Sequence, residues 1–151
     1  MFHAEVASRR VIAQPFGLVD DVSLHHVGVI VQSIERYLKH SVWQAYGDIV
    51  HDPSQGARLC LAGFFPGMSP AIELVEPTSV DSPLAAALKR GTSWHHICLQ
   101  VPTVTRADEL IREHRFLTVT DWTPAVLFGG RPVRFVYSRN RELVEFLSEE
   151  A

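Results

Sequence analysis

The chain has 151 residues, of which 46% are hydrophobic and 21% are charged, the usual balance of a globular protein. Its formal net charge of −3 and isoelectric point near 6.2 give no electrostatic reason to expect a nucleic-acid partner. Cys60 and Cys98 lie in apolar runs, and the sequence has no CxxC pair. These features exclude a zinc finger and indicate reduced cysteines in a core.

The amino-terminal stretch, residues 1–21, mixes charged and apolar side chains and has no apolar run of signal-peptide length. No segment approaches the roughly 18 apolar residues of a membrane-spanning helix. We therefore expect a cytoplasmic protein without a membrane partner. Residues 1–21 are predicted to form an extension, either packed on the domain or reaching a second subunit, and residues 22–151 to form a single domain.

The first half of the chain predicts a strand, a helix and then three strands. Ser33 is a candidate amino-terminal cap for the helix. The strands are expected at residues 23–31, 43–50, 57–65 and 71–75, with a turn at 51–56 and a loop at 66–70.

A short helix is predicted to link the two halves. Asp81 or Ser82 can cap it, Pro83 suits its first position, and Gly91 lies just past its end. The simplest role of Ser82 is this cap. The alternative is a helix start at which Ser82 receives a phosphate or carboxylate group of a substrate.

The second half repeats the order of the first. A strand is expected over residues 94–101, a helix after Thr103 or Thr105, and strands at 116–122, 133–137 and 142–147. His-His followed by apolar residues occurs at 25–26 and again at 95–96, and Glu-Leu-Val-Glu occurs at 73–76 and 142–145. An echo at both ends indicates an internal repeat. The sequence predicts an α+β fold of two tandem βαβββ modules, residues 22–78 and 93–148, joined by a linker helix within 79–92.

The repeat also predicts a metal site. Side chains alternate along a strand, so one histidine and one glutamate of each pair would face a shared cleft. Glu73 and Glu145 are favoured over Glu76 and Glu142, because the residues two positions away from them are apolar. A buried carboxylate is costly unless it binds a cation. Two imidazoles and two carboxylates suit a divalent ion such as Zn, Co, Ni, Mn or Fe(II), with room for water or substrate.

The pattern over about residues 23–147 resembles the vicinal oxygen chelate superfamily, which includes glyoxalases, extradiol dioxygenases and antibiotic-resistance proteins, and most closely its methylmalonyl-CoA epimerases. The segments that carry the resemblance are Leu-His-His-Val at 24–27, Ile-Glu-Leu-Val-Glu-Pro at 72–77, Asp-Ser-Pro-Leu-Ala at 81–85, His-His-Ile-Cys at 95–98, Gly-Arg-Pro-Val-Arg-Phe at 130–135 and Leu-Val-Glu-Phe at 143–146. The resemblance implies that the modules form a half-open, glyoxalase-like barrel, and it implies a homodimer.

The resemblance places the metal ligands at four positions: His26, Glu73, His96 and Glu145. His25 and His95 are then expected to be packing or hydrogen-bonding residues on the outer face of the sheet. In the superfamily the metal stabilises the charge that develops when a proton leaves a carbon next to a carbonyl. This implies an isomerase, epimerase or lyase for an acyl-CoA or other thioester. By analogy with glyoxalases, Glu145 is the first candidate base and Glu73 the second.

Arg131 follows two glycines and could reach a phosphate of CoA, although it could equally belong to a solvated basic face together with three neighbouring arginines.

The sequence departs from the epimerases at one position. Their second base lies on the strand after a Pro-x-Gln-Gly turn, which here is residues 53–56, and the aligned residue is Leu59. Leucine cannot carry a proton, so the two-base epimerase mechanism is disfavoured. Two other functions stay open: a metal-free protein that binds small molecules, as in antibiotic resistance, and an Fe(II) dioxygenase with His26, His96 and Glu145 as ligands.

Overall fold

The structure is a computed structural model that describes residues 20–64 and 70–150. Residues 1–19 of the predicted extension and most of the loop expected at 66–70 lie outside this range. The elements are β1 (Ser23–Ile30), α1 (Ile34–Lys39), β2 (Gln44–Ala45), β3 (Val50–Asp52), β4 (Ala57–Gly63), β5 (Ala71–Pro77), α2 (Pro83–Lys89), β6 (Trp94–Val101), α3 (Val104–Glu113), β7 (Leu117–Thr118), β8 (Thr123–Pro124), the 3₁₀ turn η1 (Val126–Phe128), β9 (Pro132–Tyr137) and β10 (Leu143–Ser148).

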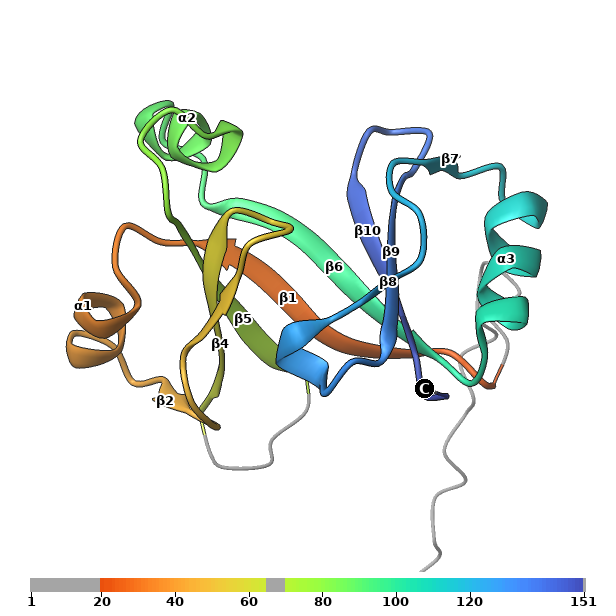
Figure 1. The fold of residues 1–151 in the computed structure, drawn as a ribbon, viewed down its shortest axis with the longest axis horizontal. Coiled ribbons are helices and arrows are strands. Elements are labelled where there is room, and N and C mark those ends of the chain that lie inside the picture. The colour runs from red at the N-terminus through yellow and green to blue at the C-terminus, as the bar shows by residue number, and fades with distance from the viewer. Residues whose placement is uncertain (1–19, 65–69, 151) are drawn as a thin grey trace, which may run out of the picture.

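All strands belong to one mixed sheet with the order β2-β4-β5-β1-β6-β10-β9-β7, in which β3 pairs with β4 and β8 with β9. The first strands of the two modules, β1 and β6, are antiparallel neighbours at the centre (Figure 1). β5 runs parallel to β1, and β10 runs parallel to β6 in the same way. The two halves are thus related by an approximate twofold, and the predicted α+β fold with two βαβββ units is confirmed.

The helices begin where their caps predict. The hydroxyls of Ser33, Ser82 and Thr103 accept hydrogen bonds from the backbone N–H of Arg36, Ala85 and Arg106. Gly91 follows α2 with a φ of +80°, which suits a glycine. None of the helices in the two described ranges is long and apolar enough to cross a membrane.

Two predicted strands are broken into short pieces. Residues 43–50 were expected to be one strand but contain only β2, with β3 beginning at Val50. Residues 116–122 contain only β7, and β8 follows them. In the second case the hydroxyl of Thr120 accepts the N–H of Phe135 at 3.0 Å, so a side chain takes one of the ladder bonds of β9.

Each half buries one face of its sheet under a helix. Ile34 of α1 packs with Cys60 and Leu74, and α3 packs its apolar side on Val136, Val144 and Phe146. Figure 1 shows these two helices at opposite ends of the molecule. Because the helices cover the outer faces, the inner faces of the two halves are left to meet in the middle.

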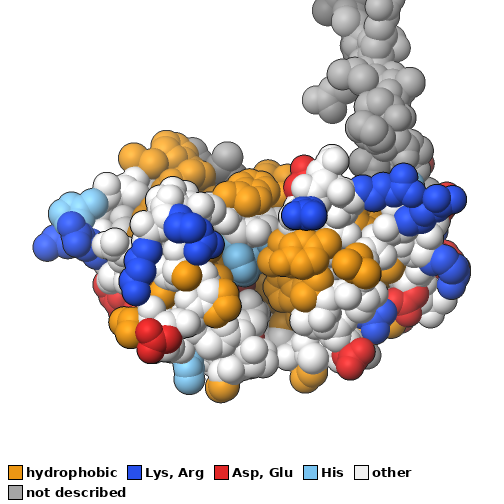
Figure 2. All heavy atoms as spheres, turned by 90° about the horizontal axis from the view of Figure 1, so that it is seen from above, with side chains coloured by type: hydrophobic (Ala, Val, Ile, Leu, Met, Phe, Trp, Pro, Cys, Tyr) orange, Lys and Arg blue, Asp and Glu red, His pale blue; other side chains and the backbone are white. Residues whose placement is uncertain are grey.

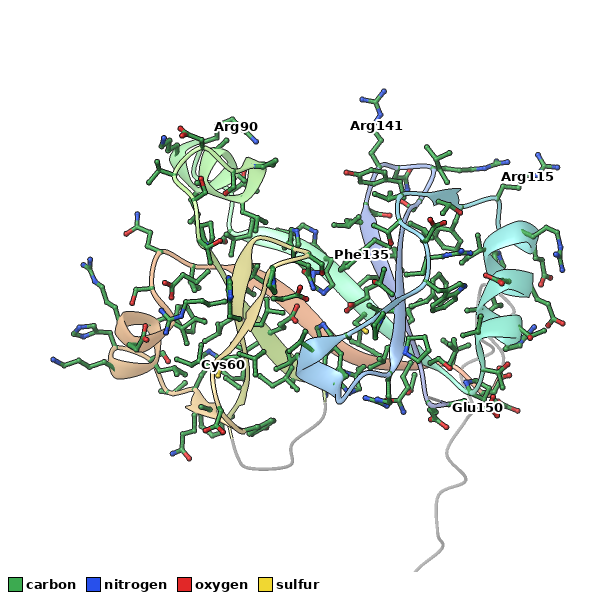
Figure 3. The ribbon with its side chains drawn as sticks, in the orientation of Figure 1. Cys60, Arg90, Arg115, Phe135, Arg141 and Glu150 are labelled. Carbon is green, nitrogen blue, oxygen red and sulfur yellow. The ribbon has the colours of Figure 1, made fainter. Side chains whose placement is uncertain are left out.

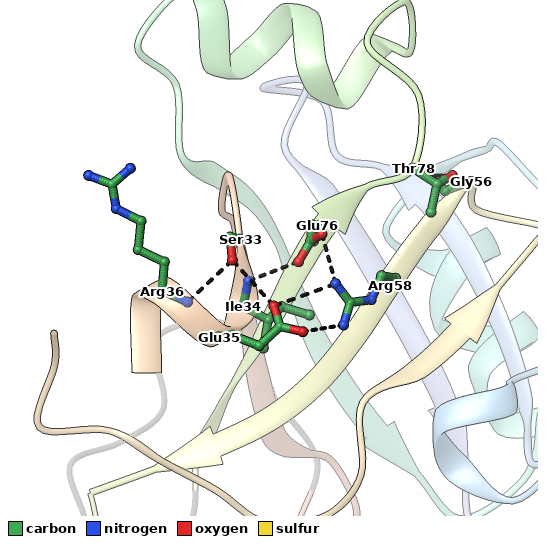
Figure 4. Close-up of polar contacts among 8 residues, drawn as sticks. All are labelled: Ser33, Ile34, Glu35, Arg36, Gly56, Arg58, Glu76 and Thr78. Atoms are coloured by element: carbon green, nitrogen blue, oxygen red, sulfur yellow. Dashed lines mark hydrogen bonds and ion pairs between the residues drawn. The ribbon is translucent and has the colours of Figure 1, made fainter. Parts of the chain in front are cut away.

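An ion-pair cluster fixes α1 to the outer face of the first half (Figure 4). Arg58 of β4 pairs with Glu76 at 2.9 Å and with Glu35 of α1, and Glu76 also accepts the backbone N–H of Ile34 at 2.9 Å. Glu76 therefore points outward, which turns Glu73, three residues earlier on β5, inward.

Candidate metal centre

Four buried polar residues meet at the centre of the sheet. They lie on the consecutive strands β5, β1, β6 and β10, and each module supplies one histidine and one glutamate. Exposure is 0% for His26 and His96 and 2% for Glu73 and Glu145. A fully buried set of two imidazoles and two carboxylates is rare without a ligand, because each charged group loses its hydration.

The donor atoms converge on one point. The Nε2 atoms of His26 and His96 lie 3.0 Å apart. The Oε2 atom of Glu145 lies 3.2 and 3.3 Å from them, and that of Glu73 lies 3.5 and 3.3 Å from them. Ligands at the usual 2.0–2.2 Å from one ion are separated by about 2.8–3.6 Å in tetrahedral or octahedral geometry. The spacing therefore fits a single divalent ion, and His26, His96 and Glu145 together could hold one.

The charges within the set interact strongly. Burial alone would lower the pKa of His26, but the close contacts of its Nε2 with the carboxylates of Glu145 and Glu73 outweigh burial and raise that pKa to about 9. Burial alone would raise the pKa of Glu145, but the imidazoles of His26 and His96 beside its carboxylate hold that pKa below the usual range. Among the described residues, no aligned donor reaches Glu145 Oε2. A cation would satisfy this buried carboxylate.

Strict alternation along the strands predicted that His25 and His95 lie on the outer face, away from the site. That prediction is wrong, because both side chains turn toward the site. Nδ1 of His25 is 2.8 Å from Nδ1 of His26, and Nδ1 of His95 is 2.9 Å from Nδ1 of His96. The pairing of β1 with β6 explains this, because each strand has one residue without a partner. On β1, Leu24 pairs with Leu99 and His26 pairs with the adjacent Cys98, so His25 is skipped. On β6, His96 pairs with Gly28 and Trp94 pairs with the adjacent Val29, so His95 is skipped. His25 and His95 are therefore the extra residues of two β-bulges, and a bulge redirects its side chain.

Gly28 makes room for His96. It faces His96 across the β1–β6 ladder, and a Cβ at this position would overlap Nδ1 and Cε1 of the His96 ring. Sequence reasoning missed this residue, although a glycine inside a strand is a signal for close approach of another group. The corresponding position in the second module is Cys98, which faces His26.

Both cysteines are free and buried, as expected. Burial, followed by the charge of Glu145, raises the pKa of Cys98 and keeps it a neutral thiol.

Two phenylalanines flank the histidine rings. Phe128 of η1 stacks on His26 with ring centres 5.4 Å apart, and Phe135 of β9 meets His96 edge to face at 5.3 Å. Phe135 lies near the middle of the molecule in Figure 3, whereas Cys60 lies in the first half. Figure 2 shows a hollow between the two lobes, with a histidine at its floor and hydrophobic side chains beside it. Hydrophobic side chains thus flank the two histidines of the candidate centre.

The position of the missing second base is apolar in the structure. Leu59 is 1% exposed and pairs with Val75 across β4 and β5, while Leu61 pairs with Glu73. Directly paired residues share a face, so Leu59 and Leu61 are both on the inner face with Glu73. A cavity of about 300 Å³ adjoins Leu61 and Leu127.

The two predicted substrate-binding residues differ in their surroundings. Ser82 is engaged in its helix cap, where its hydroxyl also donates to the carbonyl of Ser79 at 2.9 Å. The guanidinium of Arg131 lies 5.7 Å from the centre of the Phe128 ring, which stacks on His26 of the candidate metal centre. Their roles toward a substrate stay predictions.

The model of the Glyoxalase/Bleomycin resistance protein/Dioxygenase superfamily matches residues 25–135. The chain belongs to this superfamily. Bovine mitochondrial methylmalonyl-CoA epimerase is 25% identical over 119 residues, which are 76% of this chain and 66% of the bovine protein, just under two thirds of its length. An ethylmalonyl-CoA/methylmalonyl-CoA epimerase of Cereibacter sphaeroides is 24% identical over 122 residues, which are 78% of this chain and 89% of that protein.

Several solved structures share the fold of this chain. A hypothetical protein from Bacillus halodurans has a TM-score of 0.69 at 27% identity, over 86% of this chain and 96% of its own. Methylmalonyl-CoA epimerase from Mycobacterium tuberculosis has a TM-score of 0.69 at 21% identity, over 85% and 88%. At about 20% sequence identity, the epimerase structures support the glyoxalase-like fold. They do not establish the reaction, which depends on the residues of the site.

Proposed function

We propose that the chain is a divalent-metal-dependent isomerase, epimerase or lyase that removes a proton from a carbon next to a carbonyl. The observation that carries this proposal is the convergence of two histidine nitrogens and two glutamate oxygens within 3.0–3.5 Å at the buried centre. His26, Glu73, His96 and Glu145 would be the ligands. A bound ion would supply Lewis-acid stabilisation of the negative charge that develops on the carbonyl oxygen.

The residues around the site prepare this chemistry. Phe128 and Phe135 exclude water beside the histidine rings, and a low local dielectric strengthens every charge interaction there. Glu145 is a carboxylate at neutral pH, the state in which it can accept a proton. Glu145 is our first candidate base and Glu73 the second.

An acyl-CoA or another thioester is the substrate class we favour. The support is similarity to proteins named as methylmalonyl-CoA epimerases, one of which has been solved with 2-nitronate-propionyl-CoA. Arg131 beside the centre is the candidate for a substrate phosphate.

The test is exchange of a substrate α-proton in deuterated buffer, followed by mass spectrometry of a panel of acyl thioesters. We expect metal-loaded protein to exchange the proton, Glu145→Gln to lose exchange by a factor of about 10² to 10⁴, and His51→Leu on the exposed edge to behave as the parent. Full exchange by Glu145→Gln would move the base to Glu73. No exchange with any thioester by metal-loaded protein would overturn the proposal.

A second candidate is an Fe(II) dioxygenase. His26, His96 and Glu145 form a two-histidine, one-carboxylate group of the kind that such enzymes use. The position of Glu73 within 3.5 Å of both Nε2 atoms favours the first candidate, because it takes a coordination position that oxygen chemistry would need open. Oxygen uptake by iron-loaded protein with catechols distinguishes the two. The third reading, a metal-free binding protein, would be supported by purified protein that takes up no stoichiometric metal.

A further inference from the structure

The two histidines that precede the proposed ligands make the same contact in both modules. The Nδ1–Nδ1 separations of 2.8 Å for His25–His26 and 2.9 Å for His95–His96 are hydrogen-bond distances. Each of the preceding histidines is the extra residue of a β-bulge. The contact thus repeats with the approximate twofold, and in each half the backbone departs from a regular ladder to make it.

The direction of these hydrogen bonds follows from proton counting. A neutral imidazole carries its proton on one nitrogen only. If Nε2 of His26 gives its lone pair to an ion, the proton must be on Nδ1, which is then a donor. Nδ1 of His25 must therefore accept, and the proton of His25 must be on its own Nε2. The same holds for His96 and His95.

The surroundings of the contact favour support of the ligand rather than direct ligation by His25 and His95. Their Nδ1 atoms face the Nδ1 side of the neighbouring ring, whereas the metal donors meet at the Nε2 side. His25 is also in edge-to-face contact with Phe128, with ring centres 5.3 Å apart, and Phe128 in turn stacks on His26. The ring of His26 is thus held from two directions.

We propose that His25 and His95 are positioning residues that accept the Nδ1–H of His26 and His96 and so aim both Nε2 lone pairs at the ion. This inference rests on the proposed metal site. Ligand histidines usually donate their second N–H to an acceptor, which fixes the tautomer and the ring orientation. Here a second histidine, inserted by a bulge, is that acceptor in each half.

The test compares metal affinity among matched variants. His25→Leu and His95→Leu remove the acceptor, whereas His25→Asn and His95→Asn keep an oxygen near the position of Nδ1. His51→Leu, on an exposed residue of β3, is the control. We expect the leucine variants to lose Zn²⁺ and Co²⁺ affinity by about 10-fold to 100-fold in chelator competition and to change the visible spectrum of bound Co²⁺. The asparagine variants should recover most of the affinity, and the control should match the parent.

Nitrogen-15 NMR of the zinc-loaded parent gives a second readout that needs no variant to fold. We expect protons on Nδ1 of His26 and His96 and on Nε2 of His25 and His95. The opposite tautomers, or leucine variants that bind metal as tightly as the parent, would overturn the inference and leave the proposed function intact. A parent that takes up no metal would overturn both.

Discussion

At the scale of single residues, the candidate metal centre depends on a glycine as well as on its four proposed ligands. Gly28 lies against the ring of His96, so the smallest addition at this position displaces a proposed ligand.

We expect Gly28→Ala to weaken metal binding by at least 10-fold and to lower the free energy of unfolding by about 1–3 kcal/mol, because the added methyl overlaps a fully buried ring. Chelator competition and denaturant titration measure the two effects. Gly47→Ala is the matched control, since a Cβ there meets no atom within 4 Å. Unchanged metal affinity in Gly28→Ala would show that His96 does not need its present position.

Proton release is the second prediction at this scale. The pKa of His26 is raised to about 9, so His26 is protonated at neutral pH and must lose that proton to bind an ion, whereas the lowered pKa of Glu145 leaves no proton to lose there. Apparent metal affinity should therefore rise about tenfold per pH unit from 7 to about 9 and then level off. Calorimetry in buffers of different ionisation enthalpy should show about one proton released per ion at pH 7.5, and a pH-independent affinity would contradict this.

The raised pKa of His26 makes the stability of the metal-free protein change with pH in the opposite direction to the metal affinity. A folded-state pKa above the unfolded value of 6.5 contributes stability that is complete below pH 6.5 and is lost as the pH rises through about 9. A rise in pH toward 9 should thus increase the affinity for the ion and decrease the folding stability of the metal-free protein.

At the scale of elements, β4 bears on the reaction that we propose for the site. Its inner face presents Leu59 and Leu61, so no proton carrier of β4 lies opposite the candidate base. Leu59 packs with Ala57 and Val75 in an apolar cluster. A reaction with one base removes and returns the proton on one side of the carbon.

We therefore expect α-proton exchange with retention of configuration, at a rate at least 10-fold above that of inversion. Deuterium uptake and chiral chromatography of an optically pure 2-substituted acyl thioester measure the two rates. Leu59→Glu should raise inversion relative to exchange at a cost of roughly 2 kcal/mol or more in stability, because a carboxylate enters the cluster. Equal rates of exchange and inversion in the parent protein would reveal a second base elsewhere.

The elements also show what the sequence could predict. The echo of His-His and Glu-Leu-Val-Glu identified both halves, and the apolar neighbours of Glu73 and Glu145 indicated their inward register. The bulges could not be foreseen, because strict alternation assumes a regular ladder and the extra residue appears only in the pairing of β1 with β6. Phe128 was missed as well, because it reaches His26 from a short 3₁₀ turn that has no periodic pattern.

At the scale of the whole molecule, the proposed ligands join the two modules. Each half supplies one histidine and one glutamate, and the central strands β1 and β6 bring them together. An ion bound there contacts both halves of the sheet. Its removal should therefore loosen the molecule as a unit rather than one lobe alone.

We expect a chelator to lower the melting temperature of metal-loaded protein and excess Zn²⁺ to restore it. An ion present at 100 times its dissociation constant stabilises the fold by about 2.7 kcal/mol, which corresponds to several degrees for a chain of this size. Differential scanning calorimetry measures the shift. Glu73→Gln and Glu145→Gln should each reduce it, whereas a shift that persists in the double variant would place the ion elsewhere.

The bulges have a consequence for how this site can change over generations. Removing a residue from a regular strand turns every later side chain to the opposite face, so such deletions are seldom tolerated. His25 and His95 are surplus to the ladder, and loss of either would leave Leu24 with Leu99 and His26 with Cys98 in place. A single codon gained or lost at these two points can thus add or remove support for a ligand without disturbing the sheet. The hydrogen bonds of His25 and His95 with the proposed ligands can therefore be gained or lost one at a time, while the four proposed donor residues keep their positions in the sheet.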